Sequence, residues 1–336
     1  MRTSNGLVEK LLTIAVAVLL SWAVFQAGPA EAGWRDLPVV PRIEGQVEAR
    51  FVKDLRRSKR EQMRAGVFAK VGDSNTEISS ILYGFGCREP QLAGRTYLRE
   101  VIEKYNRVEL PAGPRALGGC SPVTSFSRRS NAALSGTSAN WSLVSISDLP
   151  APGEHWGRPP GCRLEETPLS CEIRITRPRY TFIMTGTNDV QFDRVDIFES
   201  TMSSLTRAVR KLGSVPVLST LPPLISPPQV PDSIEPWNAA VARVARDLDA
   251  PVINLWRALE SPFMINRGLA ADGRHLGVFP DDLEPLTSPQ PEIFRDSVNL
   301  RPRALRFGAN RRNLIWLKTL KRLDSVPESQ RSSQDP

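Results

Sequence analysis

Three side chains of this sequence could together carry out nucleophilic catalysis. Ser74 lies in Gly-Asp-Ser-Asn directly after the apolar run GVFAKV, and a hydroxyl exposed at such a strand-to-helix turn could attack a carbonyl carbon. His275 could accept the serine proton, and Asp272, three residues earlier, could orient the imidazole and stabilise its cation. The residue types therefore predict a serine nucleophile, a histidine base and an orienting acid.

The same chemistry needs hydrogen-bond donors around the oxygen that becomes negatively charged. The backbone N–H of Ser74, at the start of a predicted helix, is one such donor. Gly136, within NAALSGTS, allows a close approach of the backbone, and the side-chain amide of Asn188, within GTND, can donate a further bond. We expect these three groups to form an oxyanion hole, in which the loss of one donor costs about 3 kcal/mol of transition-state stabilisation.

Each of these residues also has a purely structural interpretation. Ser74 could be only a helix N-cap, Gly136 only a turn residue, and Asn188 with Asp189 only an Asx-turn. We assign no chemical step to Asp189, nor to Asp73, which we expect to hold the first turn. The catalytic interpretation is favoured because the complete set of residue types occurs in one chain.

Other candidate residues have weaker claims to chemistry. His155, the second of only two histidines, is expected in a surface loop. Asp281 and Asp282 are expected to be solvated, because calcium needs a larger set of oxygen ligands. Trp141 and Trp156 could stack on sugar rings, or they could pack over the core.

Bringing these distant turns together requires a scaffold, and the pattern predicts a parallel α/β sheet. Short apolar runs typical of buried strands alternate with segments of helical periodicity. The strands are predicted at 66–71, 181–186, 214–223 and 250–256, and the helices at 75–86, 194–213, 233–249 and 310–323. Functional groups of such sheets gather at the carboxyl ends of the strands, which is where the candidate residues lie.

The rest of the chain divides by composition. Residues 33–64 are polar and charged, and we expect a lead-in segment with some helix. Residues 65–323 are expected to form the main domain, which carries a Pro-, Gly- and Ser-rich inserted loop at about 137–179. Residues 324–336 are expected to be a disordered tail.

The N-terminus has the layout of a secretory signal peptide. Arg2 and Lys10 precede an apolar run, which is followed by Gly-Pro and the small-residue pattern Ala30-Glu31-Ala32. We expect cleavage after Ala32, with residues 1–32 removed and the mature protein secreted or periplasmic. The alternative is an uncleaved membrane anchor, for which the apolar run is near the lower limit of length.

Cysteine usage is consistent with export. The chain has four cysteines, Cys87, Cys120, Cys162 and Cys171, and an even count in an exported protein suggests two disulfides. Three pairings are open, of which Cys87–Cys120 with Cys162–Cys171 is the simplest. A zinc site is the rival, but C-x-x-C is missing and histidines are few, so we expect no metal and no cofactor.

The composition is that of a soluble globular protein, with 40% hydrophobic and 24% charged residues. The net charge is +8, and the leader's charged residues cancel, so the mature chain keeps this charge. Without a nucleic-acid motif, we expect a solvated basic face that is attracted to an anionic cell envelope rather than to nucleic acid. We expect a monomer.

Four motifs in this order resemble the SGNH hydrolase superfamily, also called the GDSL esterase/lipase family. They are GDSN for the serine, NAALSGTS for the glycine, GTND for the asparagine and DGRH for the Asp-x-x-His pair. The resemblance covers about residues 65–280. It implies a flavodoxin-like three-layer α/β/α sandwich with about five parallel strands, and ester hydrolysis through an acyl-serine intermediate. Asn75 departs from the family pattern, in which leucine is commoner.

Two classes of function follow. The first is an exported serine esterase, whose substrate is an acylated carbohydrate or a small acyl ester, with lipid esters as the main rival. An acyltransferase or lipase would use the same site. The second is a non-catalytic protein that binds carbohydrate or the cell envelope on the same fold, against which the complete set of catalytic residue types argues. The G-x-S-x-G elbow of α/β-hydrolases is missing.

Overall fold

A computed structural model describes residues 33–77, 80–114, 120–154, 156–225, 234–279 and 297–326. The described residues from 37 onwards belong to one compact unit, and the preceding unit contributes residues 33–36, with the short 3-10 turn η1 (Trp34–Asp36), to the described residues. The expected signal peptide at 1–32 lies outside the described residues. No helix within the described ranges is long and apolar enough to cross a membrane.

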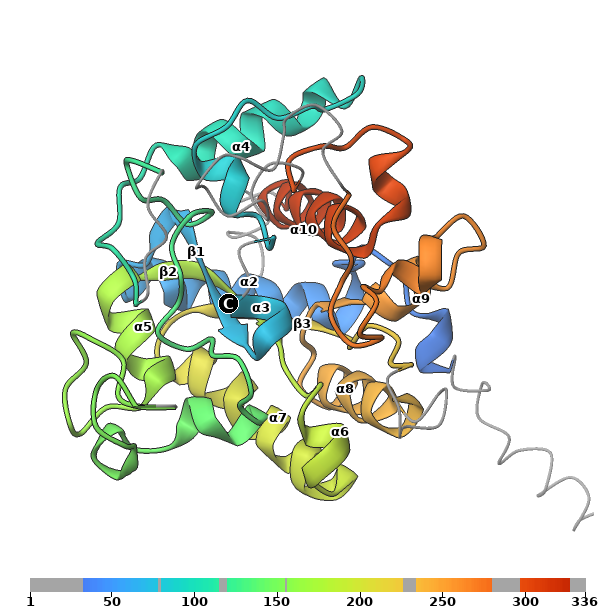
Figure 1. Cartoon of the computed structure of the whole chain (residues 1–336). Helices are drawn as coiled ribbons and strands as arrows, with labels where there is room; N and C mark the ends of the chain where they lie inside the picture. Colours follow the sequence, from blue (N-terminus) through green and yellow to red (C-terminus); the bar gives the residue numbers. More distant parts are fainter. Residues whose placement is uncertain are drawn as a thin grey trace, which may run out of the picture. The chain divides into compact units, whose positions relative to one another are not determined.

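A parallel sheet of four strands forms the centre of this unit (Figure 1). The strands pair in the order of the chain, with Lys70 opposite Phe182 and Leu218 opposite Val252. Their bounds are β1 Arg64–Gly72, β2 Pro178–Met184, β3 Val215–Ser219 and β4 Val252–Ile253. All four predicted strands are confirmed, and β4 is short because helix α9 (Leu255–Leu259) begins almost at once.

A single parallel bridge occupies the position of the fifth strand that the family resemblance implied. On the outer edge of β1, the N–H of Gly72 donates to the carbonyl of Ala132, and the N–H of Leu134 donates to the carbonyl of Gly72. The ladder stops there because the chain turns at Gly136, whose φ is +80°. Within the described residues, the sheet therefore has four strands and one isolated bridge.

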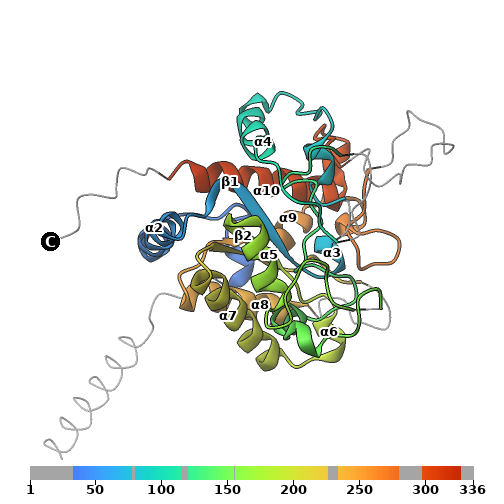
Figure 2. The same ribbon diagram turned by 90° about the vertical axis from the view of Figure 1, so that its left-hand side faces the viewer.

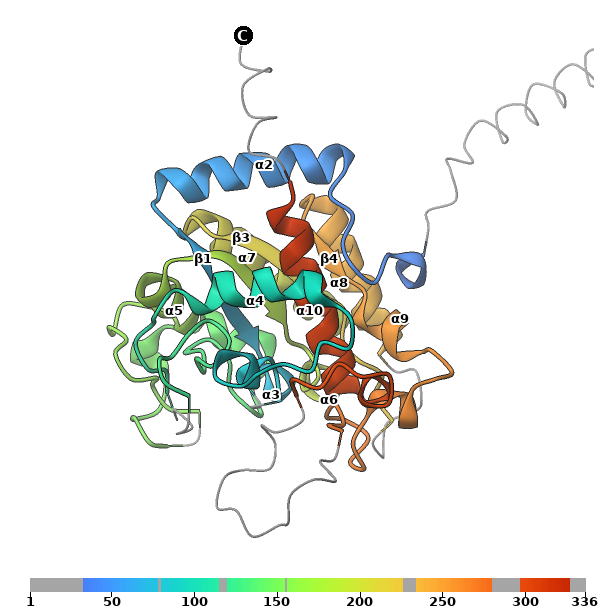
Figure 3. The same cartoon turned by 90° about the horizontal axis from the view of Figure 1, so that it is seen from above.

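Helices cover both faces of the sheet, which gives the expected three layers (Figure 2). One layer contains α5 (Pro168–Thr176), α7 (Val195–Lys211) and α8 (Glu235–Asp247), which contact one another and the strands. The opposite layer contains α4 (Arg99–Asn106) and α10 (Gly308–Asp324), and Figure 3 shows α10 running alongside the sheet. The predicted helices at 194–213, 233–249 and 310–323 are thus confirmed as α7, α8 and α10.

Aromatic side chains fill the space between the sheet and the second layer. Phe182 stacks on Trp316 of α10 with ring centroids 4.6 Å apart, and Phe68 meets Phe182 edge-on at 5.8 Å. Helix α2 (Gly45–Arg60) adds Phe51, whose ring stacks on that of Tyr180. Burial of such large apolar side chains is the main favourable contribution to folding.

Two segments differ from the expectation. In the described part of the predicted helix at 75–86, the structure has α3 (Ser74–Glu77) and the 3-10 turn η2 (Tyr83–Gly86), with Leu82 before η2 at a left-handed φ of 61°. Near its end, the expected loop at 137–179 contains helix α5, because Thr167 and Ser170 form a capping box, Pro168 stands at the first helical position and an apolar face follows.

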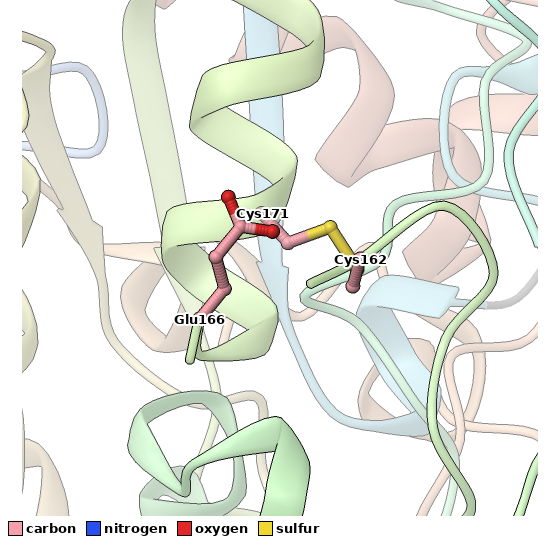
Figure 4. A group of neighbouring side chains, drawn as sticks. All are labelled: Cys162, Glu166 and Cys171. Carbon is pink, nitrogen blue, oxygen red and sulfur yellow. A yellow bond between two sulfur atoms is a disulfide. The ribbon is translucent and has the colours of Figure 1, made fainter. Parts of the chain in front are cut away.

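Both disulfides have the simplest pairing, Cys87–Cys120 and Cys162–Cys171. The second one joins the loop part of the insertion, at Cys162, to α5, at Cys171 (Figure 4). It closes a short loop across nine residues of sequence and anchors the insertion beside β1, which α5 contacts.

Candidate active site

Ser74 stands at the carboxyl end of β1, at the first residue of α3 (Figure 1). The turn is tight, because a Cβ on Gly72 would lie 2.0 Å from the carbonyl oxygen of Met184. Asp73 takes the capping role, since its Oδ1 accepts the N–H of Asn75 at 3.1 Å. The Ser74 hydroxyl is therefore not used as a helix cap and points to another element.

That element is the loop of the predicted Asp-x-x-His pair. His275 Nε2 lies 2.9 Å from Ser74 Oγ, and His275 Nδ1 lies 2.5 Å from Oδ2 of Asp272. The other Asp272 oxygen accepts the backbone N–H groups of Arg274 and His275, both at 3.0 Å. Three residues from two segments about 200 positions apart thus form one continuous hydrogen-bonded chain.

The charge state of Asp272 suits its place in this chain. Partial burial acts to raise the pKa of its carboxyl, but hydrogen bonds from the His275 ring and from two backbone N–H groups outweigh it and lower the pKa below its usual value. The carboxylate therefore stays ionised throughout the neutral range, where it can stabilise an imidazolium.

The predicted oxyanion donors come from three segments at the same edge of the sheet. Asn188 follows β2, and its Nδ2 donates one hydrogen to the carbonyl of Thr137 at 2.9 Å, one residue after Gly136. Among the described residues, no acceptor takes the N–H of Ser74 or of Gly136, nor the second amide hydrogen of Asn188. The structure thus brings Asn188 against the Gly136 turn and leaves these three donors for another group.

Buried carboxylates hold the turns that carry these donors. Glu77 of α3 accepts the backbone N–H of Ser135 at 2.6 Å and pairs with Arg129 at 2.8 Å. Asp189 accepts the N–H of Ala139 with both oxygens at 3.0 Å. The segment from Ser135 to Ala139 is therefore fixed at both ends by acids that flank the predicted site residues.

Asp73 ties the first turn to the third. Its Oδ2 accepts the N–H groups of Gly186 and Thr187 at 3.1 and 2.9 Å. Burial raises the pKa of Asp73 despite these bonds, and burial raises the pKa of Asp189 to about 7. Both aspartates hold the architecture, as expected for them from the sequence.

A buried ion pair, which sequence analysis missed, supports the start of the NAALSGTS segment. Arg128 and Glu172 of α5 pair at 2.9 Å and are both almost fully buried, and Glu172 also accepts the N–H of Asn131 at 3.0 Å. The partners are 44 residues apart, and only the capping box at the start of α5 could have placed Glu172 on a helix.

The two tryptophans have different surroundings. Trp141 is buried in a small apolar cluster with Leu134 and Ile146, so packing is its role. Trp156 is 43% exposed, and its indole Nε1–H donates to the carbonyl of Ser135 at 3.2 Å. A Cβ on Gly136 would lie 3.1 Å from that nitrogen, so the indole stands directly beside the proposed oxyanion hole.

Some residues considered in the sequence analysis lie outside the described residues, and the described residues do not form a metal site. His155, Asp281 and Asp282 lie outside the described residues. Within the described ranges, the one cluster of potential metal ligands is Cys162, Glu166 and Cys171 (Figure 4). Its two cysteines are bonded to each other and Glu166 pairs with Arg174, so the cluster does not fit a metal.

Comparison with solved structures finds several esterases at low identity. A peptidoglycan O-acetylesterase is 10% identical, with a TM-score of 0.47 over 84% of this chain and 99% of that one. A carbohydrate esterase family 3 protein from Talaromyces cellulolyticus is 16% identical, with a TM-score of 0.44 over 76% and 98%. A lipase/acylhydrolase from Enterococcus faecalis is 16% identical, with a TM-score of 0.39 over 62% and 86%. At these sequence identities and TM-scores, the similarities do not indicate the substrate of this protein.

Comparison of sequences is more decisive for the family. No curated protein matches this chain significantly. Residues 71–279, more than half of the chain, match the sequence model of the GDSL-like lipase/acylhydrolase family. This range contains all four motifs and every residue of the hydrogen-bonded chain described above. The chain therefore belongs to the GDSL-like lipase/acylhydrolase family of ester-hydrolysing enzymes.

Proposed function

We propose that this protein is a serine esterase in which Ser74, His275 and Asp272 are the catalytic residues. His275 Nε2 accepts the Ser74 hydroxyl proton as Oγ attacks the ester carbonyl carbon. The negative charge that develops on the carbonyl oxygen is stabilised by the N–H groups of Ser74 and Gly136 and by the amide of Asn188. Asp272 stabilises the imidazolium that forms.

The remaining steps return the enzyme to its starting state. The tetrahedral intermediate collapses, His275 gives its proton to the leaving alkoxide, and the acyl group stays on Ser74 Oγ. Water then attacks this acyl-serine, with His275 taking one proton from the water and returning it to Oγ. The products are an alcohol and a carboxylic acid, and no metal or cofactor takes part in these steps.

The observation that carries this proposal is the continuous chain of contacts from Ser74 Oγ through His275 to Asp272, at 2.9 and 2.5 Å. These lengths are within the reach that proton transfer between a nucleophile and its base requires. A non-catalytic protein on the same fold would have no need to keep the base in contact with the hydroxyl.

The test is hydrolysis of p-nitrophenyl acetate by the purified mature protein and by its Ser74→Ala variant. Loss of the attacking oxygen should reduce kcat by at least about 10³-fold, because only transition-state binding by the remaining groups is left. Ser147→Ala, an exposed serine in the insertion, is the control and should keep full activity. An inactive wild type, or equal rates in wild type and Ser74→Ala, would reject the esterase assignment.

For the substrate we propose an acylated carbohydrate. The indole of Trp156 beside Gly136 supports this choice, because an exposed and hydrogen-bonded aromatic face suits the apolar face of a sugar ring. A panel of acetylated sugars and p-nitrophenyl esters of increasing chain length distinguishes the candidates. A rate that rises with acyl length and is insensitive to the sugar would favour a lipid ester instead, and transfer of the acyl group to an added alcohol would indicate an acyltransferase.

We also propose that the protein is exported after cleavage behind Ala32, as a monomer whose +8 charge favours an anionic envelope. The two disulfides support export, because such bonds persist in oxidising compartments. N-terminal sequencing of the protein recovered outside the cytoplasm tests this proposal. A chain that retains Met1 and sediments with membranes would contradict it.

A further inference from the structure

Asn75, the residue directly after the nucleophile, contacts both neighbours of His275. Its Nδ2 donates to the carbonyl oxygen of Arg274 at 3.2 Å, and its Oδ1 accepts the N–H of Leu276 at 3.1 Å. The side chain is buried, with 1% of the residue exposed. Two hydrogen bonds thus join the turn of Ser74 to the peptide groups on either side of the base.

This geometry needs an amide. Asparagine offers one acceptor and two donor hydrogens on a short side chain, whereas leucine, which is commoner here in the family, offers neither. The second hydrogen of Nδ2 points toward the hydroxyl of Thr187, with a nitrogen to oxygen distance of 3.5 Å. The amide therefore lies where the first turn, the third turn and the histidine loop meet.

The backbone of Asn75 is hydrogen-bonded to Arg312 of α10. The guanidinium Nη1 donates to the Asn75 carbonyl at 2.7 Å, and Arg312 has none of its surface exposed. Its Nε and Nη2 have no hydrogen-bond partner among the described residues. An incompletely paired buried guanidinium is costly, so this bond ties the nucleophile turn firmly to a core helix at the expense of stability.

The histidine loop depends on such ties because its own side chains are open to solvent. The Asp272 side chain is 49% exposed and that of His275 33% exposed. Its other backbone hydrogen bonds include those from Ile225 N–H to the Gly273 carbonyl, from Gly273 N–H to the Ala270 carbonyl and from Ala270 N–H to the His275 carbonyl. None of these links the loop to the nucleophile turn, whereas Asn75 does so one residue away from Ser74.

We propose that Asn75 is a positioning residue. By binding the peptide groups on both sides of His275, it keeps the imidazole Nε2 within hydrogen-bond distance of the Ser74 hydroxyl. The inference rests on the proposed function, since the position of the imidazole relative to Ser74 matters only if His275 is the base. The expected consequence of losing the amide is a smaller fraction of molecules with Nε2 in reach of Oγ, which lowers kcat and leaves substrate binding unchanged.

The experiment compares Asn75→Leu and Asn75→Asp with wild type and with a matched control. Asn238→Leu is the control, because Asn238 is equally buried and its amide exchanges two hydrogen bonds with the backbone of Leu221, outside the histidine loop. We measure kcat and KM on p-nitrophenyl acetate, the rate of phosphonylation by a small fluorophosphonate, and the proton resonance of the His275 Nδ1–H. Circular dichroism gives the folded fraction of each protein.

Asn75→Leu should lower kcat and the phosphonylation rate together by about 10- to 100-fold with little change in KM, and the Nδ1–H resonance should broaden or disappear. Asn75→Asp, which keeps the acceptor for Leu276 and loses the donor for Arg274, should show a smaller loss. It also carries the test if the leucine variant does not fold. Asn238→Leu should stay within about twofold of wild type, per folded molecule.

The inference is overturned if folded Asn75 variants keep the wild-type phosphonylation rate and resonance, or if their losses only match the loss of folded fraction. It is also overturned if Asn238→Leu loses as much per folded molecule. A failure of the proposed function looks different, since wild type would then be inactive or Ser74→Ala would be as active as wild type.

Discussion

Asp272 shows how one side chain can both build a turn and serve the base in it. One of its oxygens accepts two backbone N–H groups of its own loop, while the other contacts His275 Nδ1. The carboxylate therefore has little freedom to rotate, although the side chain is half exposed. Its low pKa, caused by hydrogen bonds that outweigh burial, keeps it charged in the working range of a histidine base.

Replacing Asp272 by asparagine should lower kcat/KM by about 10²- to 10⁴-fold, because an amide neither fixes the required tautomer of His275 nor stabilises its cation. Steady-state kinetics on p-nitrophenyl acetate at pH 8 measures the loss. The thermal midpoint should change little, since the amide oxygen can still accept the backbone N–H groups. Retention of activity within threefold would show that His275 works without this acid.

At the scale of elements, the site depends on a loop that makes only one bridge to the sheet. The segment from Asn131 to Ala139 contains the proposed oxyanion glycine, yet its fixed points are carboxylates of α3, α5 and α6 (Asp189–Phe192). The backbone N–H groups of Asn131, Ser135 and Ala139 donate to these acids. The elements around the loop thus replace the missing fifth strand.

Glu77 is the acid of this group that lies nearest to the nucleophile in sequence. Glu77→Gln keeps an acceptor for Ser135 but removes the charge that pairs with Arg129, which is mostly buried. We expect a loss of about 3 kcal/mol in the free energy of unfolding, and a fall of about tenfold in kcat as the Gly136 turn loosens. Chemical denaturation and steady-state kinetics of the same preparation measure both effects.

The control for Glu77 is Glu199→Gln, which breaks a more exposed pair with Arg243 between α7 and α8. That change should cost less than about 1 kcal/mol and leave kcat unaltered. Equal effects of the two substitutions would mean that the pair at Arg129 has no special part in supporting the site.

At the scale of the whole molecule, the unit keeps ionisable groups in places where their charged forms are disfavoured. Burial raises the pKa of Asp189 to about 7 and lowers the pKa of Lys70 to about 7, and burial lowers the pKa of Arg312 to about 9. Lys70 lies in β1, Asp189 begins α6 after β2, and Arg312 lies in α10. The free energy of unfolding must therefore depend on pH in a predictable way.

Asp189 gives the clearest case. Between pH 4 and 7 the folded protein holds this proton more tightly than the unfolded chain does, so the contribution of Asp189 to stability falls as pH rises and is constant above pH 7. Asp189→Asn removes this dependence and still accepts the N–H of Ala139. The variant should exceed wild type in unfolding free energy at pH 8, by at most about 4 kcal/mol, with the difference shrinking toward pH 4.

Urea denaturation of both proteins at pH 4.5, 6 and 8 measures this difference. A gap that is the same at every pH, or that grows toward acid, would show that the pKa of the Asp189 carboxyl is not raised in the folded state.

The motifs predicted much of this organisation because two of them, GDSN and GTND, directly follow a strand. Ser74 and Asn188 could be placed at the carboxyl edge of the sheet from the apolar runs before them, and His275 from its acid partner. Asn75 with Arg312 could not be found this way, because they are 237 residues apart and nothing local marks the pairing. Helix α5 was hidden because Pro, Gly and Ser around it suggested a loop.

The most direct test of the account is to identify the residue that becomes acylated. The protein is treated with a fluorophosphonate, digested with trypsin, and the peptide Val71–Arg88 is sequenced by mass spectrometry after reduction of the disulfides. We predict a single adduct on Ser74, which pre-treatment with p-nitrophenyl acetate delays and which His275→Ala largely prevents. An adduct on another residue, or rapid ester hydrolysis by protein that carries no adduct at Ser74 after prolonged treatment, would contradict the account.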